Sequence, residues 1–190
     1  ADIHTEDDGT LSLTISTHDI FTGSSNFSFA KNIIACAAIA DTLNISWELF
    51  QDRISTFQPP PGRCEIKKSK NMTFIDDTYN ANPDSTKKSI DLLSNYKKNT
   101  VLVLGDMLEL GKYKKKFHKD VGEYAKAKGI KTLIGFGRLV KETVNGYGKR
   151  GIFFDNEKDL KAYLKKNVTS KDVILIKGSR GMKMERFINV

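Results

Sequence analysis

Apolar positions follow two periods in residues 61–190, and the change of period separates predicted strands from predicted helices. Short apolar runs alternate with segments in which apolar residues recur every three or four positions. The runs predict strands at Met72–Asp76, Val101–Gly105, Lys131–Gly137, Ile152–Asp155 and Val173–Lys177. The periodic segments predict helices near Ser85–Tyr96, Tyr113–Lys128, Arg138–Asn145, Glu157–Lys166 and Met182–Ile188. This order indicates βαβ units, so we expect an α/β fold with a Rossmann-like, mostly parallel sheet flanked by helices.

The ends of these helices carry capping residues. Asp84 or Ser85 is expected to begin the first helix, and Asn156 the fourth, because short polar side chains accept hydrogen bonds from free backbone N–H groups. Gly129 is expected to follow the end of the second helix, where a left-handed backbone conformation is common. These residues support the predicted boundaries.

Residues 1–60 have a different pattern. Leu11–Ser16 alternates apolar and polar residues as a half-buried strand does, and residues 19–21 and 27–29 are also strand-like. A helical pattern covers Lys31–Leu43, and Ser46 is expected to cap a second helix. So few apolar residues make a poor independent core. We therefore expect residues 1–60 to be the end of a larger domain.

Charge divides the chain at the same place. Residues 1–60 contain 2 basic and 8 acidic side chains, a net charge of −6, whereas residues 61–190 contain 29 basic and 15 acidic side chains, a net charge of +14. Residues 58–62 read QPPPG, which is typical of a stiff linker. The lysines are spread over many elements, so solvated surfaces are the simpler interpretation than nucleic-acid binding. We predict two units, residues 1–60 and 61–190, and no nucleic-acid partner.

Composition excludes several classes of protein. Of the 190 residues 39% are hydrophobic and 28% charged, as in globular proteins, and no apolar run approaches the roughly 20 residues of a membrane span. No signal peptide pattern is visible at the start of the chain, and the use of cysteine indicates a reducing, cytoplasmic compartment. Cys36 and Cys64 lack the spacing of a metal site and do not form a disulfide scaffold. Cys36 is expected to be a buried thiol, and His118 a solvated residue on a helix surface.

Candidate chemistry follows the predicted strands, because open α/β sheets bind ligands at the carboxyl ends of their strands. Residues 76–85 read DDTYNANPDS. These side chains suit turns and a helix cap, but they also supply acceptors for ribose hydroxyls and donors for a phosphate or carboxylate. Residues 177–181, KGSRG, suit either an anion site or a solvated glycine-rich connection. Residues 105–113 fail the phosphate-binding P-loop template in glycine spacing and at Tyr113.

Three segments in this order resemble the Mur ligase family: residues 75–85 (IDDTYNANPDS), 104–111 (LGDMLELG) and 176–180 (IKGSR). The resemblance extends from about Lys31 to the end of the chain. It implies that residues 61–190 form the C-terminal Rossmann-like domain of a Mur ligase, and that residues 1–60 are the end of the central ATP-binding domain.

The resemblance also implies roles for individual residues. Asp77 matches the aspartate that binds the ATP ribose, Arg63 the arginine at the nucleotide phosphates, and Asn32 the asparagine near adenine. Ser28-Phe29 stands near Asn32 where the family usually has His-Asn. The acyl-phosphate and the incoming dipeptide would be faced by Tyr79, Asn80, Asn82, Lys177, Ser179 and Arg180.

The implied activity is an ATP-dependent ligation. ATP would activate the carboxylate of UDP-N-acetylmuramoyl-tripeptide to an acyl-phosphate, and the amine of D-alanyl-D-alanine would displace phosphate, in peptidoglycan precursor synthesis. Such chemistry uses a P-loop and Mg²⁺, and the P-loop and magnesium ligands are expected outside this sequence. The chain alone is therefore expected to be inactive, and the enzyme a monomer. The alternative is a noncatalytic α/β module that binds a nucleotide or another anion.

Overall fold

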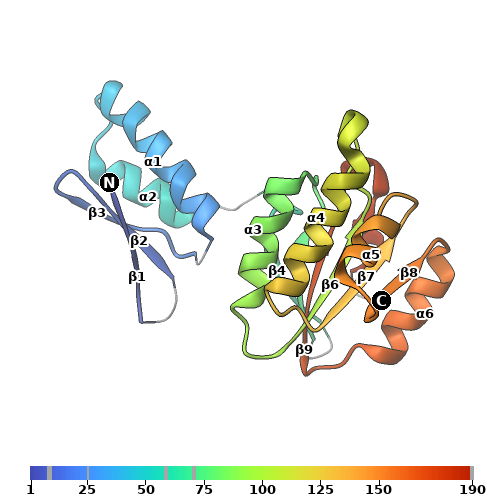
Figure 1. Ribbon diagram of the computed structural model, residues 1–190. Coiled ribbons are helices and arrows are strands. Elements are labelled where there is room, and N and C mark those ends of the chain that lie inside the picture. Colours follow the sequence, from blue (N-terminus) through green and yellow to red (C-terminus); the bar gives the residue numbers. More distant parts are fainter. Residues whose placement is uncertain (8–9, 25, 58–59, 70–71, 189–190) are drawn as a thin grey trace. The chain divides into compact units, whose positions relative to one another are not determined.

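The computed structural model describes residues 1–7, 10–24, 26–57, 60–69 and 72–188. It divides into two compact units, Ala1–Pro59 and Pro60–Val190, which are called unit 1 and unit 2 and described separately (Figure 1). The linker predicted at residues 58–62 begins with two residues, Gln58 and Pro59, that lie outside the described residues. Within the described part of the chain, no helix has both the length and the apolar composition of a membrane span.

Unit 1 is a small antiparallel sheet with two helices. Its described strands are β1 (Asp2–Thr5), β2 (Leu11–Ile15) and β3 (His18–Phe21), with β2 in the middle, and its helices are α1 (Phe27–Thr42) and α2 (Trp47–Thr56). The buried core combines residues from β2, β3 and both helices, namely Leu11, Leu13, Ile20, Ala30, Ile33, Ala37, Ala40 and Phe50. One cluster of side chains therefore stabilises this unit.

Two features of unit 1 differ from the prediction. The strand expected at residues 27–29 is wrong, because the Asn26 carboxamide accepts hydrogen bonds from the Ser28 and Phe29 amides and begins α1 there. Strand β1 was not predicted, since its sequence DIHT has a single apolar residue. The cap at Ser46 is confirmed, because its hydroxyl accepts a hydrogen bond from the Leu49 amide, 3.3 Å away.

Unit 2 contains a six-stranded sheet in its described residues, with the order β4-β5-β9-β6-β7-β8. The strands are β4 (Glu65–Ser69), β5 (Met72–Asp77), β6 (Asn99–Gly105), β7 (Thr132–Phe136), β8 (Gly151–Phe154) and β9 (Asp172–Lys177). Strand β4 runs antiparallel to β5 at one edge, and the other neighbouring pairs are parallel. The predicted mostly parallel α/β sheet is confirmed, whereas β4 was missed because EIKKS has one apolar residue.

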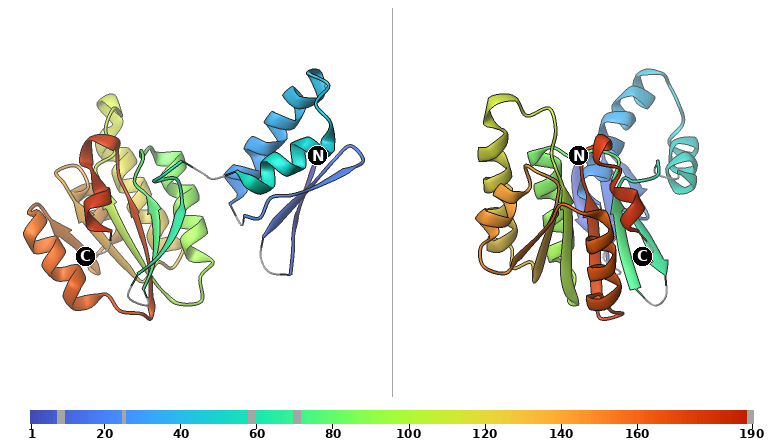
Figure 2. Two further views of the ribbon diagram at one scale, coloured as in Figure 1. Left: turned by 180° about the vertical axis from the view of Figure 1, so that it is seen from behind. Right: turned by 90° about the vertical axis from the view of Figure 1, so that its right-hand side faces the viewer.

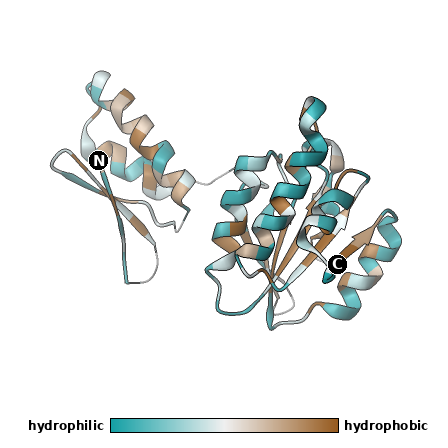
Figure 3. Cartoon of the chain, in the orientation of Figure 1, coloured by the Kyte–Doolittle hydropathy of each residue, from teal (hydrophilic) through white to brown (hydrophobic). Residues whose placement is uncertain are grey.

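Helices cover both faces of this sheet. One face packs against α3 (Pro83–Ser94), α4 (Lys114–Ala127) and α5 (Lys141–Tyr147), and the other packs against α6 (Glu157–Asn167) and the C-terminal turns (Figure 2). Strands β6 and β9 lie in the middle of the sheet and are almost wholly buried. Figure 3 shows these apolar strands between helices with hydrophilic outer surfaces. Burial on both faces explains why the central strands read as continuous apolar runs.

The C-terminal segment corrects another prediction. The helix expected at Met182–Ile188 is wrong, because two short 3₁₀ turns, Arg180–Met182 and Met184–Phe187, take its place. Lys183 separates them with a left-handed backbone, φ 48°. This break lets Met184 and Phe187 reach the core on the α6 face.

Two capping predictions have opposite outcomes at α3 and α4. Asn82, rather than Asp84 or Ser85, caps α3, and Pro83 takes the first helical position, which needs no backbone N–H. Gly129 follows the end of α4 with φ 73°, as predicted. The predicted cap at Asn156 of α6 is also confirmed.

Candidate functional site

The three motif segments meet at one end of the unit 2 sheet. Strands β5, β9 and β6 are consecutive neighbours, and each is followed by one of these segments. Because the strands are parallel, their carboxyl ends lie at the same edge, where α/β proteins bind ligands. The loops after β5 (residues 78–82), β9 (178–181) and β6 (106–110) therefore form one candidate site.

A buried ion pair lies at the centre of this site. The Lys177 ammonium is 2.5 Å from Asp77 Oδ2, and the two residues are opposite each other in β9 and β5. Asp77 Oδ2 also accepts a hydrogen bond from Ser89 Oγ, 2.6 Å away, and Lys177 donates a second one to the Asn80 carbonyl. Lys177 is 2% exposed and Asp77 8% exposed. Lys177 therefore bonds to Asp77 and to the β5 loop.

The neighbouring carboxylate belongs to a different group of contacts. Asp76 accepts hydrogen bonds from the Lys67 ammonium, 2.5 Å away, and from the Thr78 hydroxyl, 2.7 Å away. The bond to Asp76 raises the pKa of Lys67. Since adjacent residues of a strand point to opposite faces, Asp76 and Asp77 do not form a paired carboxylate site.

Ser179 joins the three loops. Its hydroxyl accepts a hydrogen bond from the Leu108 amide, 2.8 Å away, and donates one to the Ala81 carbonyl, 3.2 Å away. Its own amide donates to the Asp106 carbonyl. The side chain is buried, so its contacts connect the loops after β5, β6 and β9.

The two asparagines of the β5 loop stabilise backbone structure. The carboxamide oxygen of Asn80 accepts a hydrogen bond from the Ala81 amide, and that of Asn82 accepts one from the Ser85 amide. The Ser85 hydroxyl accepts a hydrogen bond from the Asn82 amide in return, which completes a capping box. Turn chemistry therefore accounts for the carboxamide oxygens of both residues.

Other predicted site residues are exposed. The Arg63 guanidinium lies over the Tyr79 ring, 4.1 Å from its centroid, and both side chains are exposed. The Tyr79 amide donates to the Gly62 carbonyl, which holds the segment before β4 against the β5 loop. Arg180 is exposed beside Glu185, at 3.4 Å. Asn32 is exposed on α1 of unit 1.

Sequence reasoning missed Asp106 at the end of β6. Both of its carboxylate oxygens are bonded to backbone, one to the Arg138 amide at 3.0 Å and one to the Val140 amide at 2.7 Å. An open depression beside it is lined by Asp106, Gly137, Arg138, Lys141, Phe153, Asp155 and Met182. The position of Asp106, Arg138 and Asp155 just after the ends of β6, β7 and β8 was the available signal.

Two expectations about single residues are wrong. His118 is buried rather than solvated, because its ring bonds to the Met107 amide and to the Lys114 carbonyl. Cys36 is exposed, since it lies on the outer side of α1. Cys64 has a left-handed backbone, φ 55°, and burial raises the pKa of its thiol to about 12.

Among the described residues, no group of three His, Cys, Asp or Glu side chains is arranged to hold a metal ion.

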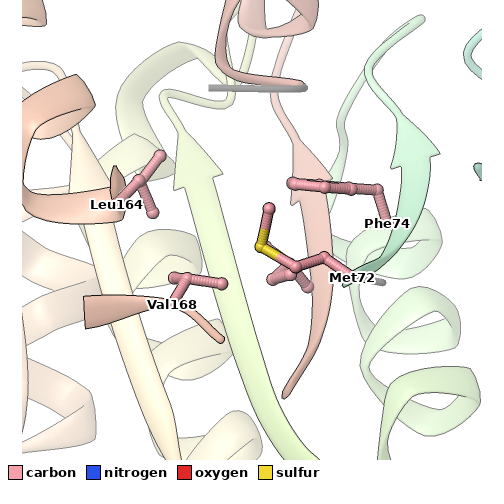
Figure 4. A pocket seen from close by; sticks show the side chains of 5 residues that line it. Met72, Phe74, Leu164 and Val168 are labelled. Atoms are coloured by element: carbon pink, nitrogen blue, oxygen red, sulfur yellow. The ribbon is translucent and has the colours of Figure 1, made fainter. Parts of the chain in front are cut away.

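A cavity of about 10 Å³ lies on the α6 face of the sheet (Figure 4). Its lining is apolar and consists of Met72, Phe74, Leu164, Val168 and Ile174. This cavity has room for about one water molecule and offers it no polar side chain.

The sequence profile of the family described as "Mur ligase, glutamate ligase domain" matches residues 62–180. This match covers most of the chain, and the chain belongs to the Mur ligase family. The resemblance predicted from the three motifs is confirmed.

Curated relatives carry the name UDP-N-acetylmuramoyl-tripeptide–D-alanyl-D-alanine ligase. The protein of Buchnera aphidicola subsp. Baizongia pistaciae is 35% identical over 158 residues, which are 82% of this chain and 34% of that protein. The protein of Bacillus subtilis is 38% identical over 131 residues, which are 65% of this chain and 28% of that protein. The chain thus spans about a third of the length of these relatives.

Solved structures share the fold. The MurF ligase of Thermotoga maritima in complex with ADP matches with a TM-score of 0.83 and 24% identity, over 99% of this chain and 44% of that one. MurF from Acinetobacter baumannii matches with a TM-score of 0.88 and 23% identity, over 98% of this chain and 43% of that one.

Proposed function

We propose that this chain is the C-terminal part of an ATP-dependent ligase that joins D-alanyl-D-alanine to UDP-N-acetylmuramoyl-tripeptide. In this proposal residues 61–190 are the C-terminal domain, and residues 1–60 are the end of the central ATP-binding domain. The observation that carries it is the meeting of three motif loops at neighbouring strand ends, in a chain of the Mur ligase family whose curated relatives bear that ligase name. The enzyme is proposed to act as a monomer in the cytoplasm.

The proposed reaction has two steps. The tripeptide carboxylate attacks the γ-phosphorus of ATP, which gives an acyl-phosphate and ADP. The amine of the dipeptide then attacks the acyl carbon, the amide bond forms, and inorganic phosphate leaves as the amine loses its proton. Positioning and charge stabilisation supply most of the catalysis in such phosphoryl transfers.

The exposed residues suit direct contact with substrates. Arg63 offers a permanent cation to the nucleotide phosphates, and Asn32 an amide to the adenine edge. Asp77 is buried, and we propose that the acceptor capacity that Lys177 and Ser89 leave free binds ribose hydroxyls. Tyr79 and Arg180 are exposed, so they are proposed to face the dipeptide and the acyl-phosphate.

The remaining candidates suit a shaping role. Lys177 and Ser179 bond to the β5 loop, whereas Asn80 bonds within that loop and Asn82 caps α3. We propose that these contacts hold the loops in the geometry that the reacting groups need. Magnesium, which such ligases use to balance phosphate charge, is proposed to be bound by residues outside this sequence together with the P-loop. The chain alone is therefore proposed to be inactive.

A ligation assay on the longest protein encoded by the gene that contains this sequence tests the proposal. The mixture contains ATP, Mg²⁺, UDP-N-acetylmuramoyl-tripeptide and D-alanyl-D-alanine, and released phosphate is measured. We expect release only when the dipeptide is present, and none from the 190-residue chain. Failure of the longer protein with every peptide acceptor and amine of this class would favour a noncatalytic anion-binding module.

Variants of the longer protein test whether Arg63 binds ATP or only supports folding. Arg63→Ala removes an exposed cation, so we expect normal folding and a KM for ATP raised about tenfold or more, because hydrogen bonds to charged groups are the stronger ones. Arg150→Ala, another exposed arginine of unit 2, is the matched control. An unchanged KM for ATP in Arg63→Ala would remove this residue from the nucleotide site.

A further inference from the structure

His118 is a buried residue of α4 with a hydrogen bond at each ring nitrogen. Nε2 lies 3.0 Å from the Met107 amide, and Nδ1 lies 2.7 Å from the Lys114 carbonyl. An amide only donates and a carbonyl only accepts, so these partners assign the proton to Nδ1 and leave Nε2 as the acceptor. Both bonds together require the neutral imidazole.

The Met107 amide belongs to the β6 loop (residues 106–110). The next amide, that of Leu108, donates to Ser179 Oγ at 2.8 Å, and Ser179 Oγ donates to the Ala81 carbonyl at 3.2 Å. Adjacent contacts thus connect His118 to the loops after β9 and β5. Lys177, the last residue of β9, donates a hydrogen bond to the Asn80 carbonyl of the β5 loop and also bonds to Asp77.

We propose that His118 is a positioning residue of the candidate site: its neutral ring holds the β6 loop in register with Ser179, and its protonation releases the Met107 amide. The effect on catalysis rests on the proposed function. The effect on the loop does not, and it can be measured on this chain alone.

The surroundings of the ring determine when it is neutral. Burial lowers the pKa of His118, and it outweighs the Lys114 carbonyl and the carboxylates of Asp106, at the end of β6, and Glu142, in α5, which all act in the opposite direction. The bond to Met107 is therefore present at neutral pH and is lost as the pH falls through the lowered pKa.

Nuclear magnetic resonance of the ¹⁵N-labelled chain tests the loop, from pH 8 down to the lowest pH at which the chain remains folded. We expect the Met107 amide shift to follow the titration of the His118 ring. His118→Gln supplies an acceptor that does not titrate, so its Met107 shift should be independent of pH. His118→Phe supplies no acceptor, so the Met107 amide should lose about tenfold in protection against hydrogen exchange. His4→Gln, a change at an exposed histidine of unit 1, is the control.

A Met107 amide that ignores the titration of His118, or that keeps its protection in His118→Phe, would overturn the proposal. If His118→Phe does not fold, the pH dependence of the Met107 amide shift in the original chain and in His118→Gln still tests the proposal. In the longer ligase we expect the acidic limb of the kcat profile to lose one ionisation in His118→Gln, with the KM for ATP unchanged. An inactive longer protein would refute the proposed function and leave the amide result standing.

Discussion

Unit 1 and unit 2 differ in how completely they bury their apolar surface. In unit 2 the sheet has a buried cluster on each face, and helices or turns cover both. In unit 1 a three-stranded sheet and two helices share one smaller cluster. Large apolar side chains remain exposed there on β3, on both helices and beside them, namely Phe21, Phe27, Ile39, Leu43, Ile45, Leu49 and Phe57. Unit 1 is therefore expected to be the less stable of the two.

The two units also differ in net charge and in the number of proposed site residues that they contain. Unit 2 has the net charge of +14 and the three motif loops, and its mostly parallel sheet positions their polar side chains. Unit 1 has the net charge of −6, and Asn32, the residue proposed there for adenine binding, is exposed on α1. A domain with two covered faces can hold buried polar contacts such as Asp77–Lys177, because the surrounding packing fixes their geometry.

The two cysteines give the largest expected difference between the units. Cys36 of unit 1 is exposed, whereas burial raises the pKa of Cys64 in unit 2 to about 12. Since the thiolate is the reactive form, iodoacetamide at pH 8 should alkylate Cys36 at least a hundredfold faster. Peptide mass spectrometry over time measures both rates, and Cys36→Ser is the control. Equal rates would mean that the Cys64 site opens readily.

Removal of one charge from the buried Asp77–Lys177 ion pair should lower the unfolding free energy of unit 2. Lys177→Met leaves the Asp77 carboxylate buried without its cation, so we expect unit 2 to lose about 3 kcal/mol or more of unfolding free energy. Lys128→Met is the matched control, since it breaks the exposed pair with Asp91 and should cost much less unfolding free energy than Lys177→Met. Urea denaturation measures both. Similar losses would mean that water reaches the Asp77–Lys177 pair.

Close packing of α4 on α5 offers a similar test within unit 2. A Cβ atom at Gly122 would overlap the Thr143 carbonyl, so Gly122→Ala should destabilise unit 2 by about 2 kcal/mol. Gly181→Ala meets only the flexible Leu108 side chain and is the control. Trp47, the single tryptophan, reports on unit 1, and the six tyrosines report on unit 2. If Gly122→Ala shifted the tryptophan transition together with the tyrosine transition, the two units would not unfold independently.

Sequence periodicity predicted the central strands and most helices of unit 2, because strands buried on both faces must be continuously apolar. It failed where burial is slight, as in β1 and β4, whose single apolar residues leave no pattern. It also failed at Met182–Ile188, where the apolar spacing suits a helix but Lys183 adopts a left-handed backbone.

The candidate site was predictable in position and less so in contacts. Strand ends located the loops, because parallel strands finish at one edge. The pairing of Asp77 with Lys177 joins residues a hundred positions apart and depends on β9 being inserted beside β5. The burial of His118 likewise depends on the β6 loop folding over α4, and an isolated helical pattern does not contain that information.

Substitutions on the exposed side of α1 are expected to change stability least in this chain. They also test most directly whether unit 1 is part of a larger domain. Ile39 and Leu43 are 61% and 65% exposed, so Ile39→Ser should change the unfolding free energy of unit 1 by less than about 0.5 kcal/mol. In the proposed ligase, where unit 1 would be the end of an ATP-binding domain, we expect further parts of that domain to cover this side of α1. The same change should then cost more than about 1 kcal/mol, because burial of an isoleucine is lost. The Trp47 fluorescence transition in urea measures both, and Asp52→Ser on the exposed side of α2 is the control. An equal, negligible effect in the longer protein would mean that unit 1 is complete by itself, with its exposed apolar side chains facing solvent in both proteins.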